Sequence, residues 1–145
     1  MRRGVTLLEL LVVLVLVGLV AGIAVPSAAS MADRLAVEHE ASRILTAYRS
    51  AWLTARVHHC LALLRITADS LAIRTVASAG SPDTLLASLT PGPSASAVAL
   101  RSPAHTAVFG PDGLAQGLAN STHVLERGRV SRRVVVSRLG RVRIQ

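Results

Sequence analysis

Aromatic residues and lysine are scarce in this sequence. Phe, Trp and Tyr occur once each and make up 2% of the 145 residues, although hydrophobic residues make up 51%. A folded core must therefore consist mainly of Val, Leu, Ile and Ala side chains. All 16 basic residues are arginines, which we ascribe to a GC-rich coding bias rather than to chemistry. The length is that of one small globular domain at most.

Cysteine is nearly absent as well. Cys60 is the single cysteine, which excludes an intramolecular disulfide. His58 and His59 precede it, but a structural metal site needs about four ligands in recognised spacings. The sequence has no G-x-S-x-G motif and no phosphate-binding loop, and no pair of carboxylates indicates a pocket. We therefore expect no metal, no cofactor and no enzymatic activity.

Acidic residues are missing from the C-terminal end. The formal net charge is +8, yet residues 5–126 contain seven arginines against eight acids. Residues 127–145 contain seven arginines and no acid, so the basic character belongs to the tail. Such a tail favours an anionic partner.

Alternation along the last strand of the tail gives it two different faces. Arg141 and Arg143 point to one side, and Val142 and Ile144 to the other. Arg133 and Arg138 lie nearby in the sequence. Two interpretations remain open: an edge strand that charge protects from edge-to-edge pairing, or a surface that binds phosphates.

A long apolar segment covers residues 5–25, in which Thr6 and Glu9 are the polar residues apart from two glycines. Twenty-one helical residues span about 31 Å, the thickness of the hydrocarbon core of a membrane. Arg2 and Arg3 precede the segment, which predicts a cytoplasmic N-terminus and an exported remainder. We therefore expect a single pass through a membrane, with the soluble part on the exported side.

Three kinds of N-terminal segment fit this pattern. A cleaved secretory signal has an apolar region of 7–15 residues, shorter than this one, although residues 27–29 offer small side chains for a cleavage site. A simple membrane anchor explains the length but not Glu9, because a carboxylate inside a bilayer is costly and usually marks function. The third kind accounts for the carboxylate as well.

The start of the chain resembles the class III signal of type IV prepilins and pseudopilins. The resemblance rests on Gly4-Val5-Thr6-Leu7-Leu8-Glu9 and on Ile23-Ala24-Val25-Pro26. It implies cleavage between Gly4 and Val5 by a prepilin peptidase, followed by N-methylation of Val5. Glu9 and Pro26 match the acidic residue and the proline of the family, whereas Val5 stands where Phe is usual.

Physical roles follow for these residues in a filament. Glu9 needs a cationic partner in an apolar core, and the amine of Val5 in a neighbouring subunit is the natural candidate. Gly18 and Gly22 form a G-x-x-x-G pattern that allows helices to approach closely, although chance explains it equally well. Pro26 removes a helical hydrogen bond and predicts a bend.

Residues 27–56 predict an amphipathic continuation of the helix. One apolar stripe recurs at steps of three and four: Val37, Ala41, Ile44, Tyr48, Ala51 and Ala55. Tyr48 and Trp52 are expected to be core anchors, with charged residues, Glu40 among them, mostly on the other faces.

The remainder, residues 57–145, predicts a β-rich head. Strands are expected at residues 61–66, 71–76, 97–101, 106–109, 122–126, 133–137 and 141–144, and loops at residues 78–83 and 90–94. The chain thus divides into a leader (1–4), a transmembrane or filament-core helix (5–26), the amphipathic helix (27–56) and the head. The predicted fold class is α+β, with one long N-terminal helix packed on an antiparallel sheet.

The order of these elements resembles the GspH/FimT family of minor pseudopilins and minor pilins. The ending that supports it is Arg133-Val134-Val135-Val136-Ser137-Arg138-Leu139-Gly140-Arg141-Val142-Arg143-Ile144. The resemblance implies a minor pseudopilin of a type II secretion system that assembles with other pseudopilins. The alternative is a FimT-type minor pilin, because Gly140-Arg141-x-Arg143 resembles that group's signature for DNA uptake. No aromatic residue is interleaved, so any DNA contact would be with the backbone.

Overall fold

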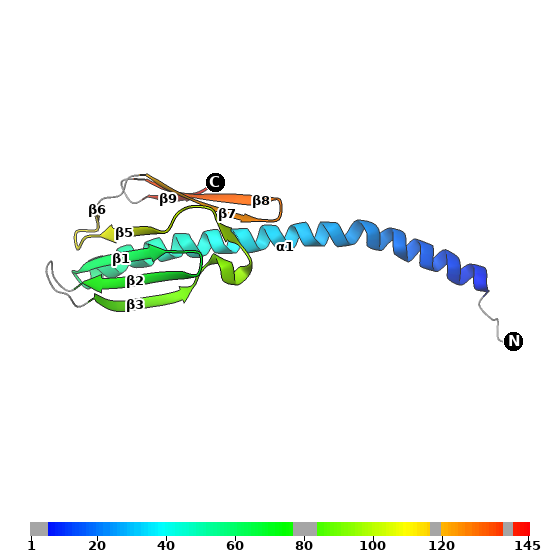
Figure 1. Ribbon diagram of the computed structural model, residues 1–145, viewed down its shortest axis with the longest axis horizontal. Helices are drawn as coiled ribbons and strands as arrows, with labels where there is room; N and C mark the ends of the chain where they lie inside the picture. Colours follow the sequence, from blue (N-terminus) through cyan, green and yellow to red (C-terminus); the bar gives the residue numbers. More distant parts are fainter. Residues whose placement is uncertain (1–5, 77–83, 117–119, 138–140) are drawn as a thin grey trace.

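The computed structural model describes residues 6–76, 84–116, 120–137 and 141–145, with no side chains for residues 23–26 and 84–86. Within these residues, one helix, α1 (Leu7–Val57), is followed by nine strands and a short 3₁₀ helix, η1 (Pro93–Ser96). Figure 1 shows the N-terminal half of α1 projecting away from a head in which two sheets flank its C-terminal half. This arrangement confirms the expected α+β class.

The helix α1 is continuous over 51 residues, or about 76 Å at 1.5 Å per residue. Its N-cap is Thr6, whose hydroxyl accepts a hydrogen bond from the backbone N–H of Glu9 at 3.3 Å. The helix continues through Pro26, whose side chain is not described. The bend expected at this residue stays a prediction. The helix ends at Val57, where the backbone N–H of His58 donates to the carbonyl of Thr54.

The head contains two antiparallel sheets rather than one. The first, sheet A, has the order β3-β2-β1-β5-β6 and comprises β1 (Leu61–Ile66), β2 (Ser70–Val76), β3 (Thr84–Pro91), β5 (His105–Phe109) and β6 (Ala115–Gln116). The second, sheet B, has the order β4-β7-β8-β9 and comprises β4 (Ala99–Leu100), β7 (Ser121–Arg127), β8 (Val130–Val136) and β9 (Val142–Ile144). Both sheets pack on α1, which therefore forms the centre of the head.

The core lies where the apolar stripe of α1 meets the two sheets. All six residues of the predicted stripe are at most 1% exposed. From sheet A they meet Leu64, Ile66 and Phe109, and from sheet B they meet residues such as Leu125 and Val134. The predicted stripe is therefore confirmed residue by residue, because its spacing follows the period of a helix.

Two helix residues differ from the expectation. Trp52 is 38% exposed rather than a core anchor, and its indole N–H donates to the carbonyl of Gly113 at 3.1 Å while the guanidinium of Arg56 lies over its ring. Glu40 is fully buried rather than on a solvent face. Its carboxylate binds the guanidinium of Arg43 at 2.9 Å and accepts a hydrogen bond from the hydroxyl of Ser96 at 2.6 Å. These two contacts compensate the cost of burying the charge.

Most predicted strands are present, and β3 is the main error. The first two strands match closely, pairing Leu61 with Val76 and Ile66 with Leu71. The expected loop at residues 78–83 lies outside the described residues. The expected loop at residues 90–94 is wrong, because β3 runs to Pro91 and η1 begins at Pro93. The sequence of β3 shows no clear alternation, so its pairing with β2 was not evident from residue pattern.

Candidate functional site

The apolar half of α1 is the first candidate site. Every described side chain from Thr6 to Gly22 is exposed, including Leu7 at 81% and Leu14 at 70%. This helix has the length and composition needed to cross a membrane, and none of its most apolar window is buried within the chain. The head contributes nothing to covering this surface, so a membrane or neighbouring subunits must do so.

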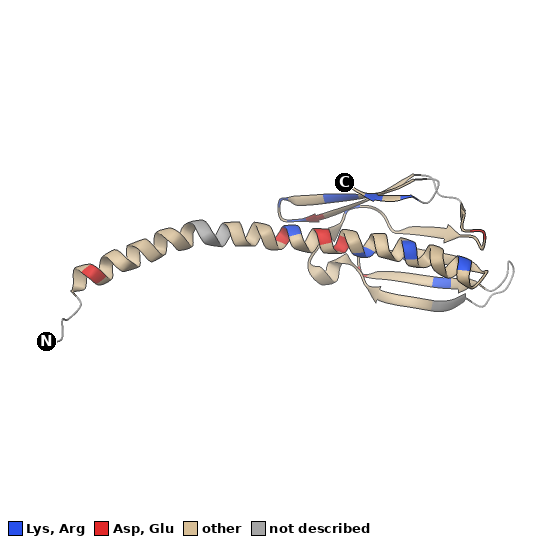
Figure 2. Ribbon diagram, turned by 180° about the vertical axis from the view of Figure 1, so that it is seen from behind, with Lys and Arg blue, Asp and Glu red and all other residues tan. Residues whose placement is uncertain are grey.

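Glu9 lies in the first turn of this apolar half. Figure 2 shows one acidic position near the N-terminal end of the projecting part of the helix, where Glu9 is the acidic residue of the first turn. A carboxylate there is favoured by the helix dipole and by the N-terminal N–H groups of the first turn. Among the residues that the structure describes, Glu9 has no ion-pair partner. Its position is consistent with the predicted contact to another subunit, and Gly4 and Val5 lie outside the described residues.

Gly18 and Gly22 are open on the helix surface. A Cβ atom built on either glycine has no neighbour within 4 Å. Neither glycine is therefore required by packing within the chain. The close approach that they allow is available to another helix, as the G-x-x-x-G hypothesis needs.

The outer face of sheet B is the second candidate site. Arg133, Arg141 and Arg143 are exposed, whereas Val142 and Ile144 are partly buried against the core. The predicted alternation is thus confirmed, and β9 is an edge strand of its sheet. The fourth predicted residue, Arg138, lies outside the described residues.

The register of β8 and β9 brings these arginines together. The backbones of Arg133 and Gln145 exchange two hydrogen bonds, of 2.9 and 2.8 Å, and Val135 pairs with Arg143. Arg133 and Arg143 are consequently diagonal neighbours on one face, within reach of each other's long side chains. Figure 2 shows the basic positions gathered along this sheet.

Ion pairing separates this face from Arg127 and Arg132 of the tail. Arg127 binds Asp33 at 2.9 Å, and Arg132 binds Glu38 at 3.3 Å, so both tie sheet B to α1. Within the described ranges, Arg133, Arg141 and Arg143 have no carboxylate partner. Their guanidinium groups are free to bind an anion from solution, whereas the paired arginines are structural.

His58, His59 and Cys60 lie at the junction of α1 and β1. Both histidines are exposed at the end of α1, and Cys60 is a buried free thiol. In the described part of the chain, no group of three or more His, Cys, Asp or Glu residues is placed to hold a metal ion.

Sequence reasoning missed a polar cluster between α1 and sheet B. The hydroxyl of Tyr48 lies 2.9 Å from Nε2 of His123, and Nδ1 of His123 lies 3.2 Å from the hydroxyl of Ser102. The ring of His105 stands edge-on to that of His123. Burial, assisted by the charge of His105, lowers the pKa of His123 to about 4. No sequence motif signals this cluster, because its members come from distant segments.

Comparison with known proteins identifies the N-terminal motif. The family described as the prokaryotic N-terminal methylation motif matches residues 1–25. In comparisons with curated proteins and with solved structures, nothing matches this chain significantly. The motif and the apolar helix indicate a membrane-anchored, type IV pilin-like protein. Proteins with this motif are structural, are processed by prepilin peptidase and assemble with other pilins.

Proposed function

We propose that this chain is a minor pseudopilin of the GspH/FimT family, working in a type II protein secretion system. Prepilin peptidase cleaves it between Gly4 and Val5, and the new amine of Val5 is methylated. It spans the inner membrane once, with a cytoplasmic N-terminus and a periplasmic head, until it joins other pseudopilins in a periplasmic pseudopilus. The observation that best supports this proposal is the apolar half of α1. It contains the N-terminal methylation motif, and the head leaves its described side chains uncovered.

Assembly in this proposal depends on the uncovered half of α1. Glu9 pairs with the methylated amine of Val5 in the adjacent subunit and sets the axial register. Gly18 and Gly22 allow neighbouring helices to approach, and Pro26 adjusts the path of the helix between the filament core and the head. The N-terminal half of α1, which enters the filament core, projects beyond the head (Figure 1). The head therefore lies on the filament surface.

A second candidate function is supported by the outer face of sheet B. A FimT-type minor pilin would bind DNA there through Arg133, Arg141 and Arg143, together with Arg138, which lies outside the described residues. The specific observation in its favour is that the three described arginines have no carboxylate partners, unlike Arg127 and Arg132. Exposed guanidinium groups on one face suit the phosphates of DNA, without sequence specificity.

A salt titration tests the two functions against each other. The side chains that the structure describes between residues 6 and 30 are all exposed, so the head that remains after removal of residues 1–30 is suited to solution measurements. If the head binds duplex DNA, the logarithm of affinity falls linearly with that of salt, by about 0.9 per phosphate neutralised. Arg141→Gln/Arg143→Gln should then make the slope shallower by up to about two units.

The matched control carries the same loss of charge on the other sheet. Arg65 and Arg74 are exposed on sheet A, so Arg65→Gln/Arg74→Gln lowers the net charge equally. DNA uptake predicts a larger effect of the Arg141/Arg143 variant than of this control. A flat titration with several duplexes at low salt eliminates the DNA function and leaves the secretion pseudopilin.

A further inference from the structure

The edge strand β3 differs from the other sheet edges of this head. Edge strands are normally short or carry charges, since an exposed ladder edge is a template for pairing. Among the described strands, β4 and β6 have two residues each, and β9 has three residues, with Arg141 before it and Arg143 within it. In contrast, β3 has eight residues, Thr84–Pro91, and none of them is charged. Its last five residues are all exposed.

The backbone of Leu89 presents hydrogen-bonding groups at this edge. Ser70 pairs with Pro91, and the N–H of Gly92 donates to the carbonyl of Asp69 at 2.8 Å, which makes the Ser70–Pro91 pair a non-hydrogen-bonded one. By alternation, the pair two residues further on, Ala72 with Leu89, is of the same type. The N–H and carbonyl of Leu89 therefore face away from β2, where another strand can bind them.

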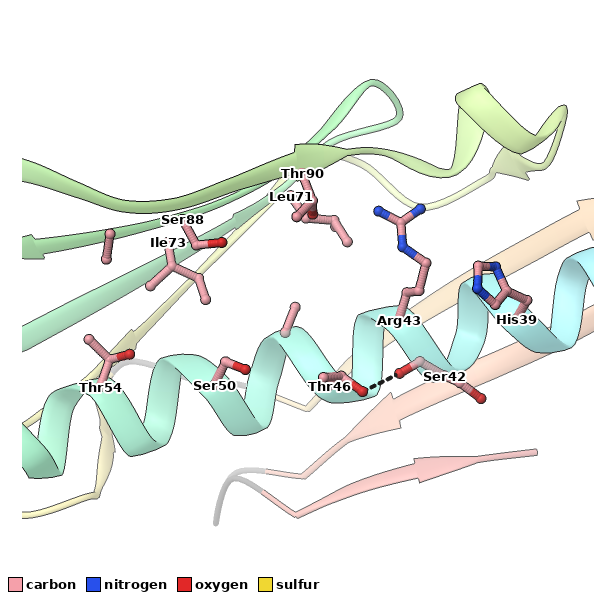
Figure 3. Close-up of a pocket in the computed structure, with 12 residues that line it drawn as sticks. His39, Ser42, Arg43, Thr46, Ser50, Thr54, Leu71, Ile73, Ser88 and Thr90 are labelled. Atoms are coloured by element: carbon pink, nitrogen blue, oxygen red, sulfur yellow. Dashed lines mark hydrogen bonds between the residues drawn. The ribbon is translucent and has the colours of Figure 1, made fainter.

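A groove lies beside this edge, between β3 and α1. It encloses about 500 Å³, and Figure 3 shows Ser88 and Thr90 facing Thr46 and Ser50 across it. Leu71 and Ile73 of β2 form its apolar part, since they pair with Thr90 and Ser88. A strand added to β3 would place alternate side chains into this groove.

The groove selects the chemistry of those side chains. Its walls are mainly hydroxyls and apolar side chains, and His39 and Arg43 line it as well. The charge of Arg43 is already bound by Glu40 and by the carbonyl of Pro91 at 2.6 Å. A carboxylate or an ammonium group on the incoming strand would gain little and lose its hydration. Short aliphatic and hydroxyl side chains, such as Val and Thr, suit these walls.

We propose that β3 and this groove bind an extended segment of another protein chain by strand addition. The segment pairs with the free edge at Leu89 and turns short, uncharged side chains toward the hydroxyls of α1. The partner is a different protein rather than a second copy of this chain. This inference rests on the anchoring of α1 in a membrane or filament, and not on the choice between secretion and DNA uptake.

Geometry argues against a second copy. The strands of sheet A run along the axis of α1 (Figure 1). A symmetric antiparallel pairing of two β3 strands reverses the strand direction and therefore points the two α1 helices in opposite directions. Two chains anchored in one membrane with their heads on the same side cannot meet in that way. A segment from another chain has no such constraint.

The test uses the full chain in lipid nanodiscs and an alternating Thr/Val octapeptide with terminal lysines for solubility. We expect saturable binding by NMR titration and slower hydrogen exchange of the Leu89 amide. Leu89→Pro removes the outward N–H but no bond to β2, and proline is tolerated on an edge strand. It should weaken binding about fivefold or more, as expected for one lost hydrogen bond.

Two controls separate the edge from the surface around it. Leu89→Ala keeps the N–H and should bind the peptide within about twofold of the wild type. Leu53→Arg adds a charge outside the groove and should also bind within about twofold. Ser50→Arg places a large charged side chain in the groove and should weaken binding as Leu89→Pro does. Equal binding of a peptide N-methylated at alternate residues, or no binding at millimolar peptide, overturns the proposal. A wild-type dimer that Leu89→Pro dissociates would instead make the second copy the occupant and also overturn it.

Discussion

The hydroxyl of Tyr48 lies 2.9 Å from Nε2 of His123, and this contact joins the centre of α1 to sheet B. Both side chains are about 1% exposed, in a core that otherwise consists mostly of aliphatic residues. Ser102 contacts the other ring nitrogen, and His105 is the titratable group facing the ring from β5. A buried histidine with hydrogen-bond partners on both nitrogens makes the attachment of sheet B sensitive to pH.

The first prediction concerns that sensitivity. His123 has a pKa of about 4 in the folded protein, below its ordinary value of 6.5, so the unfolded chain binds more protons between these pH values. Stability is therefore complete above pH 6.5 and falls as the pH drops toward 4, by about 3 kcal/mol in all. Thermal unfolding of the head from pH 4 to pH 8 measures this. His123→Gln should flatten the profile, whereas His58→Gln, at an exposed position outside the core, should leave it unchanged. An unchanged profile for His123→Gln would contradict the assignment.

The second prediction concerns the buried carboxylate of Glu40. Glu40→Ala leaves Arg43 without its partner and removes the hydrogen bond from Ser96, which holds η1 against α1. We expect a loss of about 2–3 kcal/mol in the free energy of unfolding, because one member of a buried pair is removed. Glu38→Ala is the control, since its carboxylate is 53% exposed and its ion pair should contribute less than about 1 kcal/mol. Urea denaturation of both heads gives the comparison, and equal losses would refute the distinction.

The third prediction concerns processing. The mature chain should begin at Val5 with a methylated amine, because Gly4 and Glu9 resemble the prepilin cleavage signal and lie within the matched motif, residues 1–25. Gly4→Leu should block cleavage, since glycine lets the peptidase approach the backbone closely. Intact mass spectrometry of the two membrane-extracted proteins decides the point. A wild-type chain that begins at Met1, Ala29 or Ser30 would show that the segment is not processed as a prepilin.

The fourth prediction concerns assembly through Glu9. Glu9→Ala should still be inserted and cleaved, but it should enter filaments poorly because the amine of the adjacent subunit loses its counter-ion. Glu9→Gln keeps the size without the charge and should be equally defective, whereas Val12→Ala, on the same exposed surface, should assemble normally. Co-purification with partner pseudopilins measures the outcome. Normal yields of Glu9→Gln would show that charge is not what the position supplies.

Local periodicity let the sequence by itself determine much of this protein. The steps of three and four from Val37 to Ala55 predicted the buried stripe of α1, and the alternation from Arg141 to Ile144 predicted the two faces of β9. The apolar segment with its single carboxylate predicted the anchor in the same way. Each of these features depends on neighbours within a few residues, so the order of residues is enough.

Tertiary structure alone decided the features that depend on distant segments. Glu40 looked like a surface residue, but Arg43 and Ser96 make its burial possible, and Ser96 is 56 positions away. Tyr48 and His123 lie 75 positions apart, so no local pattern announces their contact. The same holds for β3. Its residues alternate only weakly, and they form a strand because they pair with β2. The position of β3 at the sheet edge beside α1 then creates the groove. Pairing and burial are set by contacts across the fold, which residue order specifies but short windows do not reveal.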